Sequence, residues 1–342
     1  MIGNRLKLLR QANCLSLQEL SDLLVGSGLE IKRAALSHYE LGITQPTASA
    51  LEILARKLGT TPDFFYMDDW TDLHFHVYHT LDISPKLETA LYSFLQIELE
   101  KLLYIEQLLD VNCQIPTIEP MLLSRSQEEE TETLARHFRE LYGLGDAPIS
   151  GVCSMLETNG WHIIELPEIF KTDCIAGQET SKNASFILHE PLYVIDDFRT
   201  SLLKGVGYSC LKGEDESHTQ ILTDRFARAV LFPRESVYRE FGTTREDISL
   251  EELSFMKQKY GVSKRNIMAR LEELHVITKP YYDSFEDLMR LHGYPRRKRI
   301  MSETLMFYEN STLPAMRILE AYSRKLISSE VVNQLLLLKS IT

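Results

Sequence analysis

The sequence lacks several features that would place it in other classes of protein. No apolar run approaches the ~20 residues needed to span a bilayer, and the N-terminal stretch lacks the apolar core of a signal peptide. The five cysteines are scattered through 342 residues and form no CxxC pair. This spacing argues against a disulfide framework or a zinc ribbon and indicates reduced thiols. We therefore expect a cytoplasmic protein without a membrane segment.

Charge is distributed unevenly along the chain. The formal net charge is −12, and of the 37 basic and 49 acidic residues, positions 1–66 hold only seven and six. The remainder is therefore strongly acidic. A protein that bound nucleic acid over its whole surface would not have this balance. The distribution favours a small DNA-binding head on an acidic body.

Residues 1–68 have the pattern of short helices separated by turns that contain glycine. Ser16 is a typical N-cap, and the leucines that follow it share one helical face. A third helix begins near Lys32 and ends before Gly42. This arrangement is typical of a helix-turn-helix DNA reader, whose third helix enters the major groove. A helical bundle with a merely solvated polar face is the alternative that the pattern leaves open.

The third predicted helix carries short or cationic side chains, which can reach phosphates and base edges. We expect Lys32 and Arg33 to anchor phosphates. Gln18, at the start of the second helix, is a candidate phosphate donor. The predicted DNA contacts are Gln18, Lys32, Arg33, Ala34, Ser37, His38 and Thr44.

The head resembles the XRE (Cro/repressor-like) helix-turn-helix family over about residues 2–66. The resemblance rests on "RLKLLRQ", "LSLQELSDLL", "RAALSHYELGITQPT" and "LEILARKLG". Its most specific part is the S-x-Y-E-x-G run from Ser37 to Gly42. The sequence departs from the family pattern in the longer turn before the third helix. It also has Leu17 where the family has Gln, with Gln18 one place later.

Residues 69–130 are predicted to form a helical connector and linker. His74, His76 and His79 cluster in sequence, but their spacing does not align them on one helix face, so we predict no metal site there. A long amphipathic helix is predicted to begin at Ser84. This helix either connects domains or pairs with the same helix of a second copy. The Pro-containing, acidic stretch 112–130 is read as an exposed linker.

Residues 131–240 alternate between helical and strand patterns. Strands are expected in "WHIIELPE", "SFILHE" and "LYVID", and helices in "TLARHFRELYGLG", "APISGVCSMLETNG", "DFRTSLLKGVGYSC" and "ILTDRFARAVLFP". Gly205 and Gly207 lie in the middle of one predicted helix. A helix-interior Gly costs about 1 kcal/mol relative to Ala, so another constraint must place them there.

This region resembles the ImmA/IrrE-type metallopeptidase domain found behind helix-turn-helix heads, through "LGDAPISGVCSMLETNGWHIIELP", "DDFRTSLLKGVGY" and "TDRFARAVLFP". In that family an HExxH helix binds zinc and supplies a general base. The resemblance puts Lys204 and Tyr208 at the two His positions and Gly205 at the Glu. The third ligand falls at Leu222 or Gln220. It therefore implies a degenerate, zincin-like domain without metal, cofactor or peptidase activity.

Residues 241–342 are predicted to form a helical C-terminal region. Residues 248–278 have a second helix-turn-helix-like pattern, in which Lys264, Arg265 and Arg270 are possible DNA contacts. The alternative is packing against the peptidase-like core. A basic run at residues 295–299 either touches phosphates or is solvated.

Together these patterns predict a mainly α protein with a small β-sheet, of the α+β class. We expect a dimeric, sequence-specific transcriptional repressor whose partner is double-stranded operator DNA. A small-molecule or protein effector is expected to bind a cleft formed by Arg199, Lys204, Gly207 and Tyr208. The alternatives are an antitoxin or defence-system subunit that binds a protein partner, and a zinc-dependent regulatory peptidase.

Overall fold

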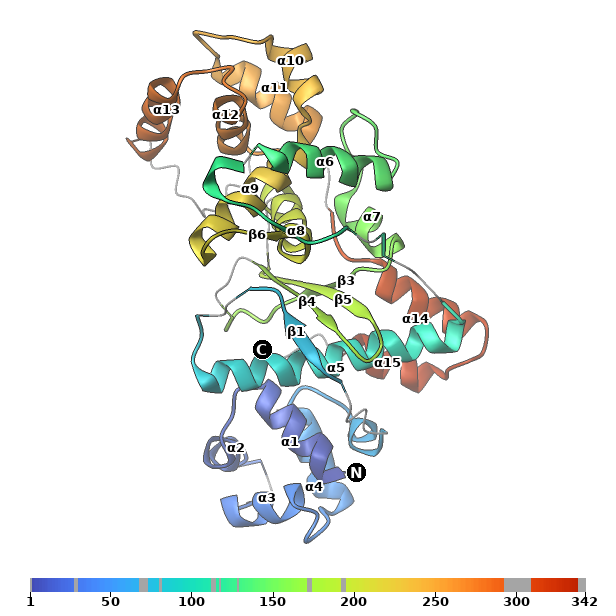
Figure 1. The fold of residues 1–342 in the computed structure, drawn as a ribbon. Helices are drawn as coiled ribbons and strands as arrows, with labels where there is room; N and C mark the ends of the chain where they lie inside the picture. The colour runs from blue at the N-terminus through green and yellow to red at the C-terminus, as the bar shows by residue number, and fades with distance from the viewer. Residues whose placement is uncertain are drawn as a thin grey trace.

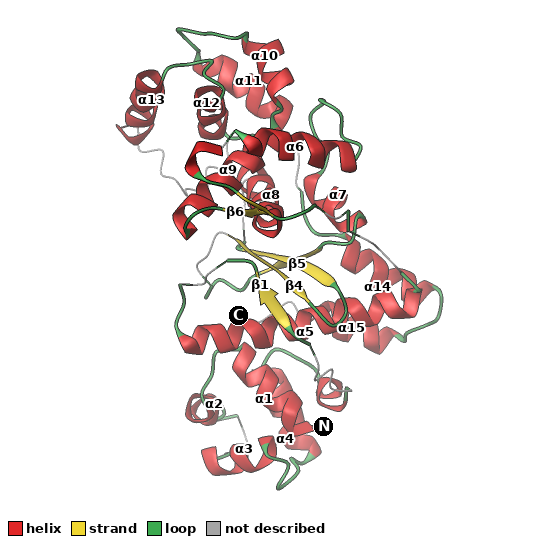
Figure 2. Ribbon diagram, viewed as in Figure 1, coloured by secondary structure: helices red, strands yellow, loops and turns green. Residues whose placement is uncertain are grey.

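The fold is mainly helical with a small mixed sheet, as the sequence predicts (Figures 1 and 2). The computed structural model describes residues 2–27, 30–67, 73–79, 82–111, 115–116, 118–127, 129–170, 174–191, 195–291 and 309–337. Within these ranges no helix is long and apolar enough to cross a membrane. The predicted basic run at 295–299 lies outside them.

The N-terminal head consists of α1 (Ile2–Ala12), α2 (Leu17–Leu23), α3 (Arg33–Glu40), α4 (Ala48–Lys57) and the 3₁₀ helix η1 (Pro62–Tyr66). Ser16 caps α2 through a complete capping box with Glu19, which explains why this helix begins where the sequence predicts. Gly42 follows α3 with φ +70°, a conformation that favours glycine. The helices enclose a core built largely from leucine side chains.

The long helix α5 (Pro85–Leu109) supports the head from one side. Ser84 caps it through the N–H of Leu87, confirming the predicted start. Arg5 of α1 is 2% exposed, donates to Glu100 of α5 and lies over the Phe64 ring. The apolar core of the head continues through α5 to one face of the sheet. The head and α5 are therefore packed together rather than joined by a flexible tether.

The central sheet has the order β1-β4-β5-β3, in which only β3 and β5 are parallel. Its strands are β1 (Phe75–Val77), β3 (His162–Glu165), β4 (Cys174–Glu179) and β5 (Ala184–His189). The sequence patterns predicted β3 and β5 but missed β1 and β4. Of the strand predicted at 192–196, residues 192–194 lie outside the described residues, and residues 195 and 196 belong to α8 rather than to a strand.

The second face of the sheet is covered by helices. The helices α7 (Val152–Thr158) and α8 (Ile195–Cys210) pack on the strands. The helix α9 (Glu216–Leu231) packs on α8 and α6 (Glu130–Leu141) on α9, and all four share one core with the sheet. A two-stranded parallel pair joins β2 (Met121–Leu122) to β6 (Leu211–Lys212), and the 3₁₀ helix η2 (Arg125–Gln127) follows β2. The reading of residues 112–130 as an exposed linker is thus wrong in part, because β2 is paired and Leu123 is buried.

The C-terminal region divides between the two ends of the body (Figure 1). The helices α10 (Arg234–Phe241), α11 (Leu250–Tyr260), α12 (Lys264–Glu273) and α13 (Lys279–Leu291) lie at the end opposite the head. The helices α14 (Leu313–Ser323) and α15 (Ser329–Leu337) return to α5, where Ile318 and Leu335 pack with Ile105 and Leu109. These last two helices therefore contact the same helix that supports the head.

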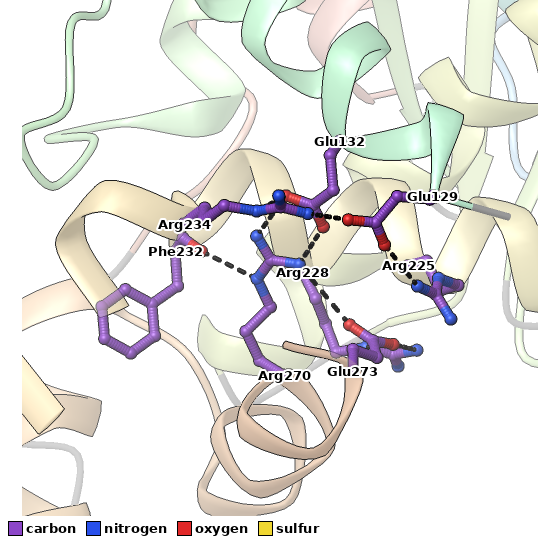
Figure 3. A network of polar contacts seen from close by, with 8 residues as sticks. All are labelled: Glu129, Glu132, Arg225, Arg228, Phe232, Arg234, Arg270 and Glu273. Carbon is purple, nitrogen blue, oxygen red and sulfur yellow. Dashed lines mark hydrogen bonds and ion pairs between the residues drawn. The ribbon is translucent and has the colours of Figure 1, made fainter. Parts of the chain in front are cut away.

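A network of buried ion pairs locks α12 to α6 and α9 (Figure 3). Arg270 is fully buried and binds both carboxylate oxygens of Glu132 and the carbonyl of Phe232. Arg228 donates twice to Glu273, at 2.6 and 2.9 Å. Burial by itself raises the pKa of Glu132, but the hydrogen bonds and charge of Arg270 outweigh it, so that pKa is lowered.

Removal of the Glu132 carboxylate is expected to destabilise the fold strongly. The variant Glu132→Ala leaves the buried Arg270 charge without its main partner, which costs about 3–5 kcal/mol of unfolding free energy in denaturant titrations. Because the pKa of folded Glu132 is lowered, its contribution is present at neutral pH and is lost as the pH falls through that pKa.

The matched control is Asp283→Ala, which breaks the exposed pair between Lys279 and Asp283 and costs at most about 1 kcal/mol. The double variant Glu132→Leu/Arg270→Met should recover most of the loss, since it removes both partners and leaves no buried Arg270 charge without its carboxylate. Equal losses in Glu132→Ala and Asp283→Ala would contradict a structural role for the network.

Candidate nucleic-acid interface

Helix α3 buries one side and presents the other to solvent. Leu36 is fully buried in the head core, and Ile31 just before the helix is 5% exposed. On the outer side Lys32, Arg33 and Ala34 are exposed. His38 is also exposed and Ser37 is half-buried. The side chains that the sequence predicts to read DNA therefore lie together on an accessible surface.

The N-terminus of α3 is open to an anion. Its N-cap is Lys32, whose side chain makes no capping hydrogen bond. The first backbone N–H groups of a helix have no partner within it, and they carry the positive end of the helix dipole. Together with the exposed cations of Lys32 and Arg33, this end suits a phosphate group.

Contacts inside the head fix the direction of α3. Arg10 of α1 forms two hydrogen bonds to the Glu40 carboxylate, at 2.6 and 2.9 Å, and a third to the carbonyl of Leu15 at 2.7 Å. The hydroxyl of Ser21 in α2 donates to the carbonyl of Ile31 at 2.9 Å. A Cβ at Gly3 would lie 2.6 Å from the carbonyl oxygen of Glu40, so α1 passes α3 closely. These contacts hold α3, and with it the exposed side chains of its outer face, in a fixed position within the head.

Gln18 and Thr44 lie at the border of this surface. Gln18 is exposed, and its amide donates to Asp22 one turn along α2 at 2.8 Å. Thr44 is exposed in the turn after α3, where its N–H points to the carbonyl of His38 at 3.4 Å. The contacts of both residues with DNA stay predictions.

Two apolar side chains near Thr44 were not among the predicted DNA contacts. Leu41 and Ile43 are 70% and 63% exposed in the turn that follows α3. An exposed apolar side chain at this edge can contact the methyl group of thymine. The available signal was the apolar pair on either side of Gly42, in a turn where polar residues are usual.

The residues aligned with the zinc-binding helix make other contacts. Lys204 of α8 pairs with Asp224 of α9 at 2.9 Å. Tyr208 stacks on His79 with ring centroids 4.2 Å apart, and burial raises the pKa of Tyr208 to about 12. Burial also lowers the pKa of His79 to about 4, with Lys212 and Lys204 adding to the effect.

Neither of the two positions that the resemblance gives for the third zinc ligand carries a carboxylate or an imidazole. Leu222 is fully buried among apolar side chains, and Gln220 is exposed. Over the described ranges, no group of three His, Cys, Asp or Glu side chains is placed to hold a metal ion. His74 and His76 are exposed around β1, away from the stack that His79 forms with Tyr208.

Two of the four residues predicted to form an effector cleft, Arg199 and Gly207, are in close contact with other parts of the fold. Arg199 is 5% exposed and donates to Glu309, at 2.5 Å, and to the carbonyls of Ile149 and Ser150. Gly207 is covered by α9, because a Cβ there would lie 3.2 Å from Thr223. Arg199 and Gly207 thus contribute to packing, and the binding of an effector at these four residues stays a prediction.

The glycines of α8 allow the helix to pack closely on both sides. A Cβ at Gly205 would lie 2.9 Å from Cγ2 of Ile187 in β5. Gly207 makes the corresponding close approach to α9. The constraint that outweighs helix propensity at these positions is therefore the contact of α8 with the sheet and with α9.

The second helix-turn-helix-like pattern is formed by α11 and α12. Gly261 in the turn has φ +64°, and Ser263 caps α12 through the N–H of Asn266. Two of its predicted cations are used internally, since Arg270 binds Glu132 and Arg265 pairs with Glu286 at 3.4 Å. Because Arg270 is fully buried, it is not available to DNA, and the packing alternative holds for this residue.

Comparison with known proteins covers the head. Residues 6–65 match a family model described as helix-turn-helix, which spans most of α1 through η1. No curated protein matches the chain. The match identifies an XRE-type helix-turn-helix domain and supports a DNA-binding transcription regulator. The predicted ImmA/IrrE-type relationship concerns the rest of the chain and stays a prediction.

Substitution of Gly205 by Ala tests the packing explanation. Ala raises helix propensity by about 1 kcal/mol, but its methyl group would press on Ile187. Overpacking in a core costs about 1–3 kcal/mol, so we expect a net loss of stability in thermal or denaturant unfolding. In an Ile187→Ala background the same change should become neutral or stabilising. If Gly205→Ala alone stabilised the protein, close packing of α8 on Ile187 could not be the reason for a glycine at this position.

Proposed function

We propose that this protein is a dimeric, sequence-specific transcriptional repressor that reads operator DNA with α3. The observation that carries the proposal is the outer surface of α3, where Lys32, Arg33, Ala34 and His38 are exposed while Leu36 anchors the helix in the head. The helix-turn-helix match over residues 6–65 supports the DNA-binding part of this proposal.

The arrangement assigns different roles to the two ends of the surface. Lys32 and Arg33 at the N-terminus of α3 would bind phosphates, which fixes the position of the head but carries no sequence information. Ala34, Ser37 and His38 lie further along the helix and would face base edges in the major groove. Thr44 would contact the border of the same site.

We expect a dimer because the outer surface of α3 is small. One short helix contacts only a few base pairs, and helix-turn-helix proteins reach specificity by reading two half-sites. A head that is packed on its body by Arg5 and Glu100 can be paired through the body. Binding across a promoter would then block transcription.

We further propose that the body has no peptidase activity and serves in signal reception or partner binding. Support comes from Lys204, which puts a cation where the resemblance would place a zinc ligand and pairs with Asp224. The measurement is the zinc content of freshly purified protein. Stoichiometric zinc would overturn the proposal and favour the regulatory peptidase.

Removal of two cations should weaken binding to all DNA sequences. In the variant Lys32→Ala/Arg33→Ala, two phosphate contacts are lost. The negative slope of log affinity against log salt should therefore become shallower by roughly 2. The measurement combines capture of genomic fragments at about physiological salt with titration of one captured fragment.

The matched control is Lys279→Ala/Arg290→Ala, which removes two exposed cations of α13 at the opposite end of the molecule. This variant should bind as the unmodified protein does. If the unmodified, folded protein recovers no fragment selectively, the head alone does not suffice for selective DNA binding. The alternative of an antitoxin or defence-system subunit that binds a protein partner is then favoured.

Substitution of a base-facing residue should instead change sequence preference. His38→Ala is expected to cost about 1–3 kcal/mol on the best operator while leaving binding to unrelated DNA nearly unchanged. Selection from a randomised operator library compares the preferred sequences of the two proteins. An identical preference in both would remove His38 from the reading surface.

A further inference from the structure

A cavity of about 610 Å³ lies between α5, the helix that supports the head, and the C-terminal helices α14 and α15. Its walls come from one face of α5, the edge strand β3 with the turn that follows it, and α14 with α15. Figure 1 shows α14 and α15 beside α5, below the sheet. Asn13 and Cys14, which directly follow α1 in the head, also line it. The cavity therefore touches both the DNA-reading head and the body.

The size and lining of this cavity suit a small organic molecule. Sites for such ligands have volumes of about 300–1,000 Å³ and mostly apolar walls with a few polar groups. Here the apolar wall includes Phe94, Ile105 and Leu166, together with Phe198 and Ile318. An apolar body of moderate length can therefore be enclosed.

The cations in the wall are already matched by carboxylates. Lys101 donates to Glu98 at 2.6 Å. Arg317 donates to Glu106, which also lies 3.2 Å from Nε2 of His162. An incoming anion would have to compete with these carboxylates for both cations.

One further carboxylate, that of Glu157, is buried in the wall. Glu157 is 3% exposed and accepts hydrogen bonds from the Ser311 hydroxyl, at 2.6 Å, and from the N–H of Leu313, at 3.4 Å. Glu157 also accepts a hydrogen bond from the backbone N–H of Thr312, and the charge of Arg317, which donates to Glu106, acts on it as well. A carboxylate accepts about four hydrogen bonds, so Glu157 has acceptor capacity left. Burial raises its pKa, and a cation beside it would relieve that cost.

The mouth of the cavity has the same sign of charge. Glu165 and Glu168 are exposed on β3 and the turn after it, and both belong to the lining. With Glu157, the wall has three carboxylates beyond those that pair with Lys101 and Arg317. A cationic molecule is favoured at such a site over an anionic one of the same shape.

We propose that this cavity binds a small amphipathic cation, an apolar molecule with one amine that lies against Glu157. Since the cavity wall includes Asn13 and Cys14, occupancy changes the position of the head on α5 and hence the affinity for DNA. This second step rests on the proposed repressor function, whereas the binding step does not.

Binding is tested by calorimetry on the full chain with n-octylamine and n-octanoate, which differ mainly in the charge of the head group. We expect one octylamine per chain, bound at least about tenfold more tightly than octanoate. Equal or tighter binding of octanoate, or no binding of octylamine, would overturn the proposal.

Two variants locate the site. Glu157→Gln keeps the shape of the side chain and should lower octylamine affinity about tenfold, whereas Glu130→Gln, the same change at an exposed position of α6, should not. Ala315→Phe fills the cavity from α14 and should abolish binding. Thermal unfolding checks that each variant is folded. Unchanged binding in folded Glu157→Gln and Ala315→Phe would overturn the assignment.

A second measurement separates the two steps. Octylamine should change the dissociation constant of a captured operator fragment for the unmodified protein and leave it unchanged for Ala315→Phe. Stoichiometric octylamine binding without an effect on DNA would overturn the coupling and keep the site. If the protein captures no DNA, the repressor function fails, while calorimetry still decides whether the cavity binds the amine.

Discussion

The arrangement of the whole chain depends on how α1 packs against α5. The buried Arg5 guanidinium binds Glu100 there, and the leucine core of the head continues past α5 to the sheet. Removing a charge from water is costly unless its partners are in place, so the ion pair favours one position of α1 on α5. The far end of α5 then receives α14 and α15. One helix thereby connects the recognition surface, the sheet and the C-terminus of the described chain.

The parts that could be predicted from sequence are those determined by local signals. Ser16, Ser84 and Ser263 mark three helix starts, and the hydrophobic period of the intervening segments gives the helices. The strands β3 and β5 were found because they are apolar and flanked by turns. The strands β1, β2 and β6 have only two or three residues, and they exist because a distant segment offers hydrogen-bond partners.

The candidate site divides in the same way. Exposure of Lys32, Arg33 and His38 follows from helical periodicity around Leu36, so it was accessible to pattern analysis. The pairing of Lys204 with Asp224 and the stack of Tyr208 on His79 join residues far apart in sequence, and no local pattern indicates them. The cleft predicted from the resemblance stays a prediction. Arg199 and Gly207 make packing contacts in the structure, and the cavity beside β3 was not indicated by any local pattern.

Close packing of the head on α5 has a consequence for how paired copies would address DNA. In a dimer of such protomers, the distance and angle between the two α3 helices are set by the contact between bodies, since the heads cannot swing on a tether. The double helix turns once in about 10–10.5 base pairs, so roughly 5 extra base pairs between half-sites would turn the second one to the opposite face. Half-site spacing thus becomes a selectivity determinant that no base-reading side chain carries.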